Sequence, residues 1–141
     1  MKGRLVVVVA ALAVAASLPA AGPEDYEMTT YQVAFLRKGP AWTPGNTPEL
    51  QELQKGHMAN IQKMAETGKL LIAGPFSDGG DLRGMFVFRV DTLEEAKALA
   101  DQDPAVKAGR LVLEWHPWFA AKNITVTAKA VGGVRSRFFG I

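Results

Sequence analysis

The chain has 141 residues, which fits one domain, and 48% of them are hydrophobic, enough to build a core. It contains no cysteine, which excludes disulfides, thiol chemistry, iron–sulfur clusters and thiolate zinc. The net charge of +2 comes from Lys2 and Arg4, because residues 21–119 carry ten basic and fourteen acidic groups and residues 120–141 carry four basic groups and no acidic one. This weak basic tail predicts no nucleic-acid partner.

Residues 1–20 have the layout of a secretory signal peptide. Lys2 and Arg4 precede an apolar run, and small residues follow it up to Ala20. Cleavage after Ala20 would release a periplasmic or secreted protein with no stable membrane insertion. The alternative is an uncleaved N-terminal helix that anchors the chain, because the apolar run is only slightly shorter than the roughly 20 residues that span a bilayer.

The chain after the signal begins with a linker, a strand and a long loop. Residues 21–27 are polar and predict the linker. Residues 28–36 are rich in β-branched and aromatic side chains, which predicts the strand. Residues 37–48 contain three prolines and two glycines, a composition that predicts a loop of unusual length.

A helix is predicted from Pro48 to Glu66. Thr47 suits the N-cap, Pro48 suits the first helical position, and Gly68 stops the helix. An apolar stripe recurs at helical spacing through Leu50, Leu53, Met58, Ile61, Met64 and Ala65. His57 lies on this stripe, four residues from both Leu53 and Ile61, where an apolar residue is expected.

The rest of the chain predicts further elements from turn residues and apolar patterning. In order they are a short strand over 69–73, a turn over 77–81, a strand over 84–90, a helix from about 92 to 100 that ends before Pro104, a strand over 110–118, and an extra strand around 124–131 followed by a frayed end.

Strand, helix, strand, strand, helix, strand is the pattern of an α+β, ferredoxin-like βαββαβ protomer with an antiparallel sheet, here over residues 28–119. The strands show little alternation of polar and apolar residues, so both sheet faces are expected to be buried. Two helices cover only one face. The other face is therefore expected to pack on a second copy of the chain, which predicts a homodimer.

Several short motifs follow one another in order between residues 28 and 119. They are Gly56-His57-Met58 with Ile61, Gly68-Lys69-Leu70-Leu71 leading into Ala73-Gly74-Pro75-Phe76, then Gly84, Glu94-Glu95-Ala96, and Asp103-Pro104 with Ala108-Gly109. In this order they resemble the YCII-related (YciI-like) domain family of the dimeric α/β-barrel superfamily. The chain departs from that pattern at Ala105, where an aromatic residue is common, in the tail of residues 120–141, and in its export signal.

The resemblance implies a homodimer whose sheets face each other and a cleft centred on a histidine and an aspartate. By matching positions these catalytic residues are His57 and Asp103. It also implies proton-transfer, lyase or dehalogenase-type chemistry on cyclic organic acids, with no metal and no cofactor.

The residues themselves leave two interpretations of this pair open, a functional one and a structural one. A neutral imidazole on an apolar helix face needs partners for two nitrogens, and a carboxylate can fix its tautomer and raise its basicity. Asp103, after the second helix, could supply that carboxylate. Alternatively, His57 is a hydrogen-bonded core residue and Asp103 only ends a helix and caps the turn before Pro104.

Other residues are candidates for substrate binding. Gly74, with Pro75 after it, would let a ligand approach the backbone, and Ser77 could orient a polar group or form a turn. Trp42 could line an apolar pocket or belong to the dimer contact. The chain has only two histidines, and Glu114 with His116 supplies too few ligands for a metal site.

Two functions fit these features. The first is an exported small enzyme in which His57, oriented by Asp103, does lyase- or hydrolase-type acid/base chemistry on a small organic acid or lactone. The second is a non-catalytic homodimeric module that binds a small-molecule ligand or serves as a scaffold.

Overall fold

The computed structural model describes residues 27–126, so the predicted signal peptide, most of the linker and the end of the tail lie outside the described residues. Its elements are β1 (Met28–Lys38), α1 (Pro48–Glu66), β2 (Leu70–Pro75), β3 (Leu82–Phe88), α2 (Leu93–Ala100), α3 (Pro104–Lys107) and β4 (Leu111–Ala121). This order confirms the α+β, ferredoxin-like prediction. None of the helices in this part combines the length and apolarity that a membrane crossing requires.

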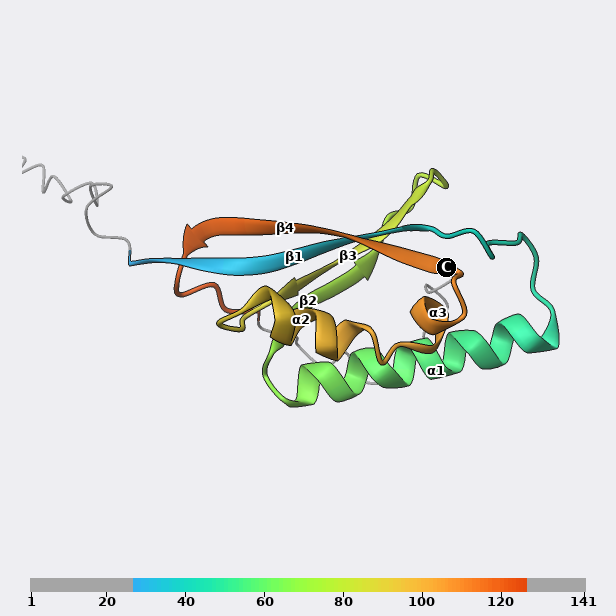
Figure 1. Ribbon diagram of the computed structural model, residues 1–141, viewed down its shortest axis with the longest axis horizontal. Helices are drawn as coiled ribbons and strands as arrows, with labels where there is room; N and C mark the ends of the chain where they lie inside the picture. Colours follow the sequence, from blue (N-terminus) through green and yellow to red (C-terminus); the bar gives the residue numbers. More distant parts are fainter. Residues whose placement is uncertain (1–26, 127–141) are drawn as a thin grey trace, which may run out of the picture.

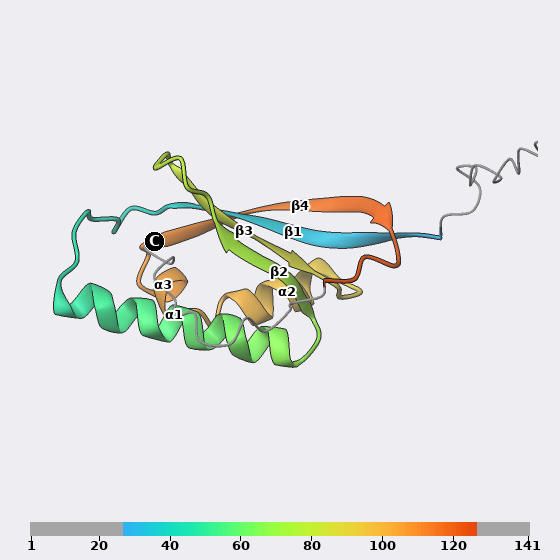
Figure 2. The ribbon, with the colours of Figure 1, turned by 180° about the vertical axis from the view of Figure 1, so that it is seen from behind.

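The four strands form one antiparallel sheet in the order β2-β3-β1-β4. All three helices lie on the same side of the sheet, with α1 running along β2 and α3 beside the first half of α1 (Figures 1 and 2). In this strand order β1 lies between β3 and β4, in the interior of the sheet. Its register with these two strands positions the residues beneath the helices.

Several predicted boundaries are wrong by a few residues. β1 continues two residues beyond the expected end, because Arg37 and Lys38 still pair with β4. β3 begins two residues early, because Leu82 still pairs with Arg37, and it also ends two residues early. A third helix, α3, was not expected. Asp103 does not merely end α2; its side chain accepts from the Ala105 N–H and caps a new helix that starts at Pro104. Residues 124–126 are not in a strand, contrary to the predicted extra strand.

One apolar core lies between the helices and the sheet. Its buried members include Leu36 and Phe86 from the sheet, Met64 from α1, and Ala96 and Ala100 from α2. Ala65 is exposed, so its predicted place on the buried stripe is wrong. Met64 already occupies the buried side of that turn, and the next residue is rotated by about 100°.

The opposite face of the sheet carries a second apolar cluster. Its buried members are Tyr31, Val33, Val87 and Ala120. Beside them lies an open apolar groove of about 280 Å³, lined by Val33, Phe35, Met85, Val87, His116, Pro117 and Trp118. Trp118 stays 45% exposed, which is unusual for so large an apolar side chain. No described helix covers this face (Figures 1 and 2).

Candidate active site around His57 and Asp103

Helices α1 and α3 approach each other closely where Gly56 of α1 packs against Pro104 of α3. A Cβ atom placed on Gly56 would come within 2.9 Å of Pro104 Cγ. A side chain at residue 56 would therefore push the two helices apart. Because His57 follows Gly56 and Asp103 precedes Pro104, this contact brings the histidine and the aspartate together although 46 residues separate them in the chain.

His57 and Asp103 form a buried hydrogen-bonded pair. The distance from His57 Nδ1 to Asp103 Oδ2 is 2.7 Å, and the two residues are 1% and 0% exposed. A contact this short is typical of a charge-assisted hydrogen bond. The pair therefore lies in a region of low dielectric constant, where a charge on either partner depends strongly on the other.

The other contacts of Asp103 determine which nitrogen of His57 carries the proton. Asp103 Oδ1 accepts from the Ala105 N–H at 2.8 Å, and Asp103 Oδ2 also accepts from Asn60 Nδ2 at 3.3 Å. All three neighbouring groups are thus arranged as donors toward an ionised carboxylate. We therefore assign the proton of neutral His57 to Nδ1, which leaves the lone pair on Nε2.

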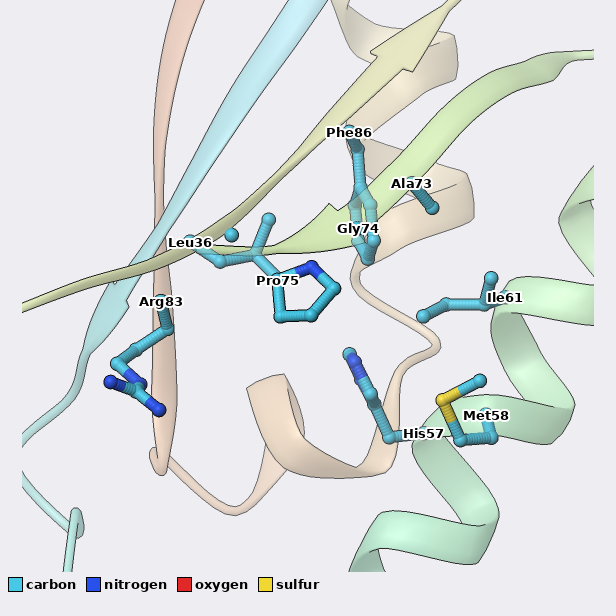
Figure 3. Close-up of a pocket in the computed structure, with 10 residues that line it drawn as sticks. Leu36, His57, Met58, Ile61, Ala73, Gly74, Pro75, Arg83 and Phe86 are labelled. Carbon is cyan, nitrogen blue, oxygen red and sulfur yellow. The ribbon is translucent and has the colours of Figure 1, made fainter. Parts of the chain in front are cut away.

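His57 Nε2 is buried and has no hydrogen-bond partner among the described residues. The ring stacks on Phe86, with centroids 6.2 Å apart and planes 24° apart, so its orientation is restrained on one side by packing and on the other by Asp103. Figure 3 shows the ring rising from α1 toward Pro75 and Gly74. A buried acceptor without a donor is costly, and this one belongs to a residue that lines a cavity, where a ligand could satisfy it.

The cavity beside His57 has a volume of about 50 Å³ and largely apolar walls. It is lined by Leu36, His57, Met58, Ile61, Ala73, Gly74, Pro75, Arg83, Gly84 and Phe86 (Figure 3). A Cβ on Gly84 would lie 2.5 Å from the Gly74 carbonyl oxygen, so only glycine allows β2 and β3 to approach here. These strands form the wall opposite α1.

The structure places the predicted site residues in three groups. His57, Gly74 and Pro75 line the cavity, whereas Asp103 lies behind His57 and reaches the cavity only through it. Ser77 is exposed in the connection between β2 and β3 and does not line the cavity. Trp42 does not line it either.

Two residues of this region were not predicted. Asn60 could have been found, because it lies three residues after His57 and therefore on the same side of α1. Arg83 had no local signal, since its position depends on how β3 pairs with β1.

His116 is remote from this pair. It belongs to β4, lines the groove on the opposite face of the sheet, and pairs through Nε2 with Glu114 Oε1 at 2.9 Å. The hydrogen bond from His116, and a second one from Arg37, lower the pKa of Glu114 below its usual range. Within residues 27–126, no group of three or more histidine or carboxylate side chains is placed to hold a metal ion.

Part of the chain matches a known protein family and a curated relative. The YCII-related domain matches residues 32–116. A curated relative, the uncharacterized protein YjpA of Bacillus subtilis (strain 168), is 34% identical over 68 residues, which cover 48% of this chain and 78% of YjpA.

A solved structure is also similar, that of 5-chloro-2-hydroxyhydroquinone dehydrochlorinase (TftG) from Burkholderia phenoliruptrix AC1100 in complex with 2,5-dihydroxybenzoquinone. It is 19% identical with a TM-score of 0.46, over 64% of this chain and 93% of TftG. The family match covers more than half of the chain and confirms the resemblance that the short motifs indicated. The chain belongs to the YCII-related domain family.

Proposed function

We propose that this protein is a small exported enzyme that moves protons on a small organic acid or lactone, with His57 as the catalytic base and acid and without a metal or cofactor. The observation that carries the proposal is the buried Nε2 of His57, which lines a cavity while Asp103 holds Nδ1 at 2.7 Å. A histidine that only stabilises a core would have both nitrogens satisfied.

The geometry supports proton transfer in two steps. In the first, the Nε2 lone pair takes a proton from a C–H or O–H group of the substrate, and the electron pair of that bond stays on the substrate. In the second, the Nε2–H group returns the proton to another atom of the substrate or to a leaving group. This order gives an isomerisation or an elimination with His57 regenerated.

Asp103 acts as a positioning residue in this scheme. Its carboxylate keeps the proton of neutral His57 on Nδ1 and faces the positive charge that forms when Nε2 is protonated. Asn60 and the Ala105 N–H fix the carboxylate itself. The apolar walls of the cavity strengthen these electrostatic interactions by keeping water out.

Homodimer formation is part of the same proposal. The sheet face opposite the helices has an apolar groove of about 280 Å³, and Trp118 at its edge is 45% exposed. Contiguous apolar surface of this kind marks an interaction site. A second copy would cover it with an identical apolar face. Export is proposed from the charge and apolar pattern of residues 1–20 alone.

Deuterium exchange tests the chemistry with simple model compounds in place of the natural substrate. Purified protein is incubated in D2O with 2-oxobutyrate, γ-butyrolactone and α-angelica lactone, and loss of each C–H signal is followed by proton NMR. We expect exchange with at least one of these compounds. His57→Gln should slow it by about 10²–10⁴-fold, the usual contribution of a general base.

The second histidine provides a matched control. His116→Gln alters a histidine on the other face of the sheet and should leave the exchange rate within twofold. Near-ultraviolet circular dichroism shows whether each variant is folded. If folded His57→Gln exchanges protons as fast as the unmodified protein, the proposal is wrong. Binding without exchange would instead favour a non-catalytic ligand-binding module.

A further inference from the structure

A β-bulge places Arg83 in the cavity of His57. In the pairing of β1 with β3, Leu36 faces Gly84 and Arg37 faces Leu82, so Arg83 is the extra residue. A bulge redirects a side chain that would otherwise point to the alternate face. Arg83 accordingly lines the same cavity as Gly84 and Phe86, and Figure 3 shows its side chain to the lower left of Pro75, with His57 to the lower right.

Three basic side chains gather around Trp42 next to this cavity. The guanidinium carbons of Arg83 and Arg110 lie 4.9 Å and 4.1 Å from the centre of the Trp42 ring, and Lys38 Nζ lies 5.7 Å from it. Arg110 also donates to the Thr43 carbonyl oxygen at 2.8 Å. The aromatic ring and the loop thus hold the cations in place despite their mutual repulsion.

The described residues provide little negative charge to balance this cluster. Neither Arg83 nor Arg110 forms an ion pair with a carboxylate of residues 27–126. Within residues 27–126 the only ion pair of the cluster joins Lys38 Nζ to the exposed Asp81, at 3.6 Å. Burial, and then the positive charge of Arg83, lower the pKa of Arg110. The cluster therefore has unbalanced positive charge.

Arg83 also has unused hydrogen-bonding capacity. Within the described residues it donates one hydrogen bond, from Nη1 to the Gly80 carbonyl oxygen at 3.2 Å. Its Nε is buried without a partner. A guanidinium has five N–H donors in a planar fork that matches a carboxylate. Arg83 lines the largely apolar cavity while its guanidinium lies over Trp42, so this donor set is suited to an anionic oxygen pair at the edge of the cavity.

We infer that Arg83, held by Trp42 and supported by Arg110, forms an anion subsite that binds a carboxylate of the ligand at the cavity of His57. The inference rests on the site of the proposed function and adds to it the substrate class: a small carboxylic acid, bound at Arg83 with an apolar part against Ile61 and Phe86. Neutral lactones would bind without this contact.

Crotonate and crotonamide provide a matched test, because they have nearly the same shape and differ in charge. Dissociation constants are measured at low ionic strength from chemical-shift changes in proton–nitrogen spectra of the full chain. We expect crotonate to bind at least tenfold more tightly than crotonamide. In Arg83→Gln the two constants should agree within twofold, with the crotonamide constant unchanged.

Two further arginine variants complete the design. Arg83→Lys keeps the charge without the fork and should retain a preference of about threefold. Arg89→Gln removes an exposed arginine at the end of β3 and should retain the full tenfold preference. If the unmodified protein shows no preference for crotonate, or if Arg83→Gln keeps a tenfold preference, the anion subsite is refuted.

The outcome is independent of catalysis. His57→Gln should slow deuterium exchange by about 10²–10⁴-fold yet preserve the preference for crotonate, because the carboxylate contacts Arg83. A preference that persists while no compound exchanges protons would support the anion subsite and contradict the proposed chemistry. Exchange without any preference for crotonate would support the proposed chemistry and refute the anion subsite.

Discussion

Asp103→Asn is the most informative single substitution in this site, because it changes one atom and reverses the hydrogen-bonding of a buried group. Asp103 now accepts from His57 Nδ1, from Asn60 Nδ2 and from the Ala105 N–H. An asparagine has one oxygen and one NH2 group. Its oxygen can keep the bond to the Ala105 N–H, and its NH2 group then faces His57 and Asn60.

This reversal should move the proton of His57 from Nδ1 to Nε2. The amide NH2 group can donate a hydrogen bond only to an unprotonated Nδ1. The lone pair of the ring then lies on Nδ1, and Nε2 carries the proton in its place. A charge-assisted hydrogen bond worth about 1.5–3 kcal/mol becomes a neutral one worth about 0.5–1.5 kcal/mol. Adding the donor-to-donor contact with Asn60, we expect the free energy of unfolding to fall by about 2 kcal/mol.

Two measurements check this expectation. Long-range proton–nitrogen NMR of the histidine rings identifies the protonated nitrogen, and urea unfolding gives the change in free energy. Asp103→Ala serves as a reference, because it removes all three hydrogen bonds, one of which, from the Ala105 N–H, is the cap of α3. It should cost about 4 kcal/mol, including about 1 kcal/mol for the cap.

A single pattern of results would refute the reasoning about the pair. If folded Asp103→Asn still carries the His57 proton on Nδ1 and unfolds within about 0.5 kcal/mol of the unmodified protein, the carboxylate does not determine the tautomer. The assignment of Nε2 as the cavity-facing base would then fail with it.

Three further predictions concern the rest of the molecule. Gly84→Ala should lower the free energy of unfolding by about 1–3 kcal/mol, because the new Cβ meets the Gly74 carbonyl oxygen. Gly74→Ala should cost far less, because nothing lies within 4 Å of a Cβ at that position. Urea unfolding compares the two variants, and equal costs would contradict the packing argument. The depressed pKa of Glu114 means that the contribution of this carboxylate to stability is present above its ordinary pKa of about 4.5 and is lost as the pH falls through its lower folded value. Carbon NMR titration should place the midpoint of Glu114 below 4.5 in the unmodified protein and nearer to 4.5 in His116→Gln. Identical midpoints in the two proteins would count against the hydrogen bond from His116. Trp118→Glu should weaken the proposed homodimer by about 30-fold or more, since it buries a charge in place of about 2 kcal/mol of apolar contact; light scattering after size exclusion measures the mass, and an unchanged monomer–dimer equilibrium would exclude this face as the interface.

The sequence predicted the fold class and most of the elements, although not α3, because those depend mainly on local chemistry. Helical spacing of apolar residues, the Thr47 cap and Gly68 predicted α1 with the bounds that the structure has. The predicted order of strands and helices then matched the pattern of a ferredoxin-like fold. The short motifs also predicted the family. Errors of two residues at the ends of β1 and β3 arose because a strand ends where its partner ends.

The tertiary structure decided which residues share the cavity, because this depends on pairing between segments distant in the sequence. The bulge in β3 places Arg83 on the wall of the cavity that His57 also lines, and no pattern in residues 82–88 indicates it. Similarly, the sequence marked Asp103 as a residue before a proline. Only the contact of Gly56 with Pro104 explains why its carboxylate reaches His57 Nδ1, since close packing of two helices depends on both surfaces at once.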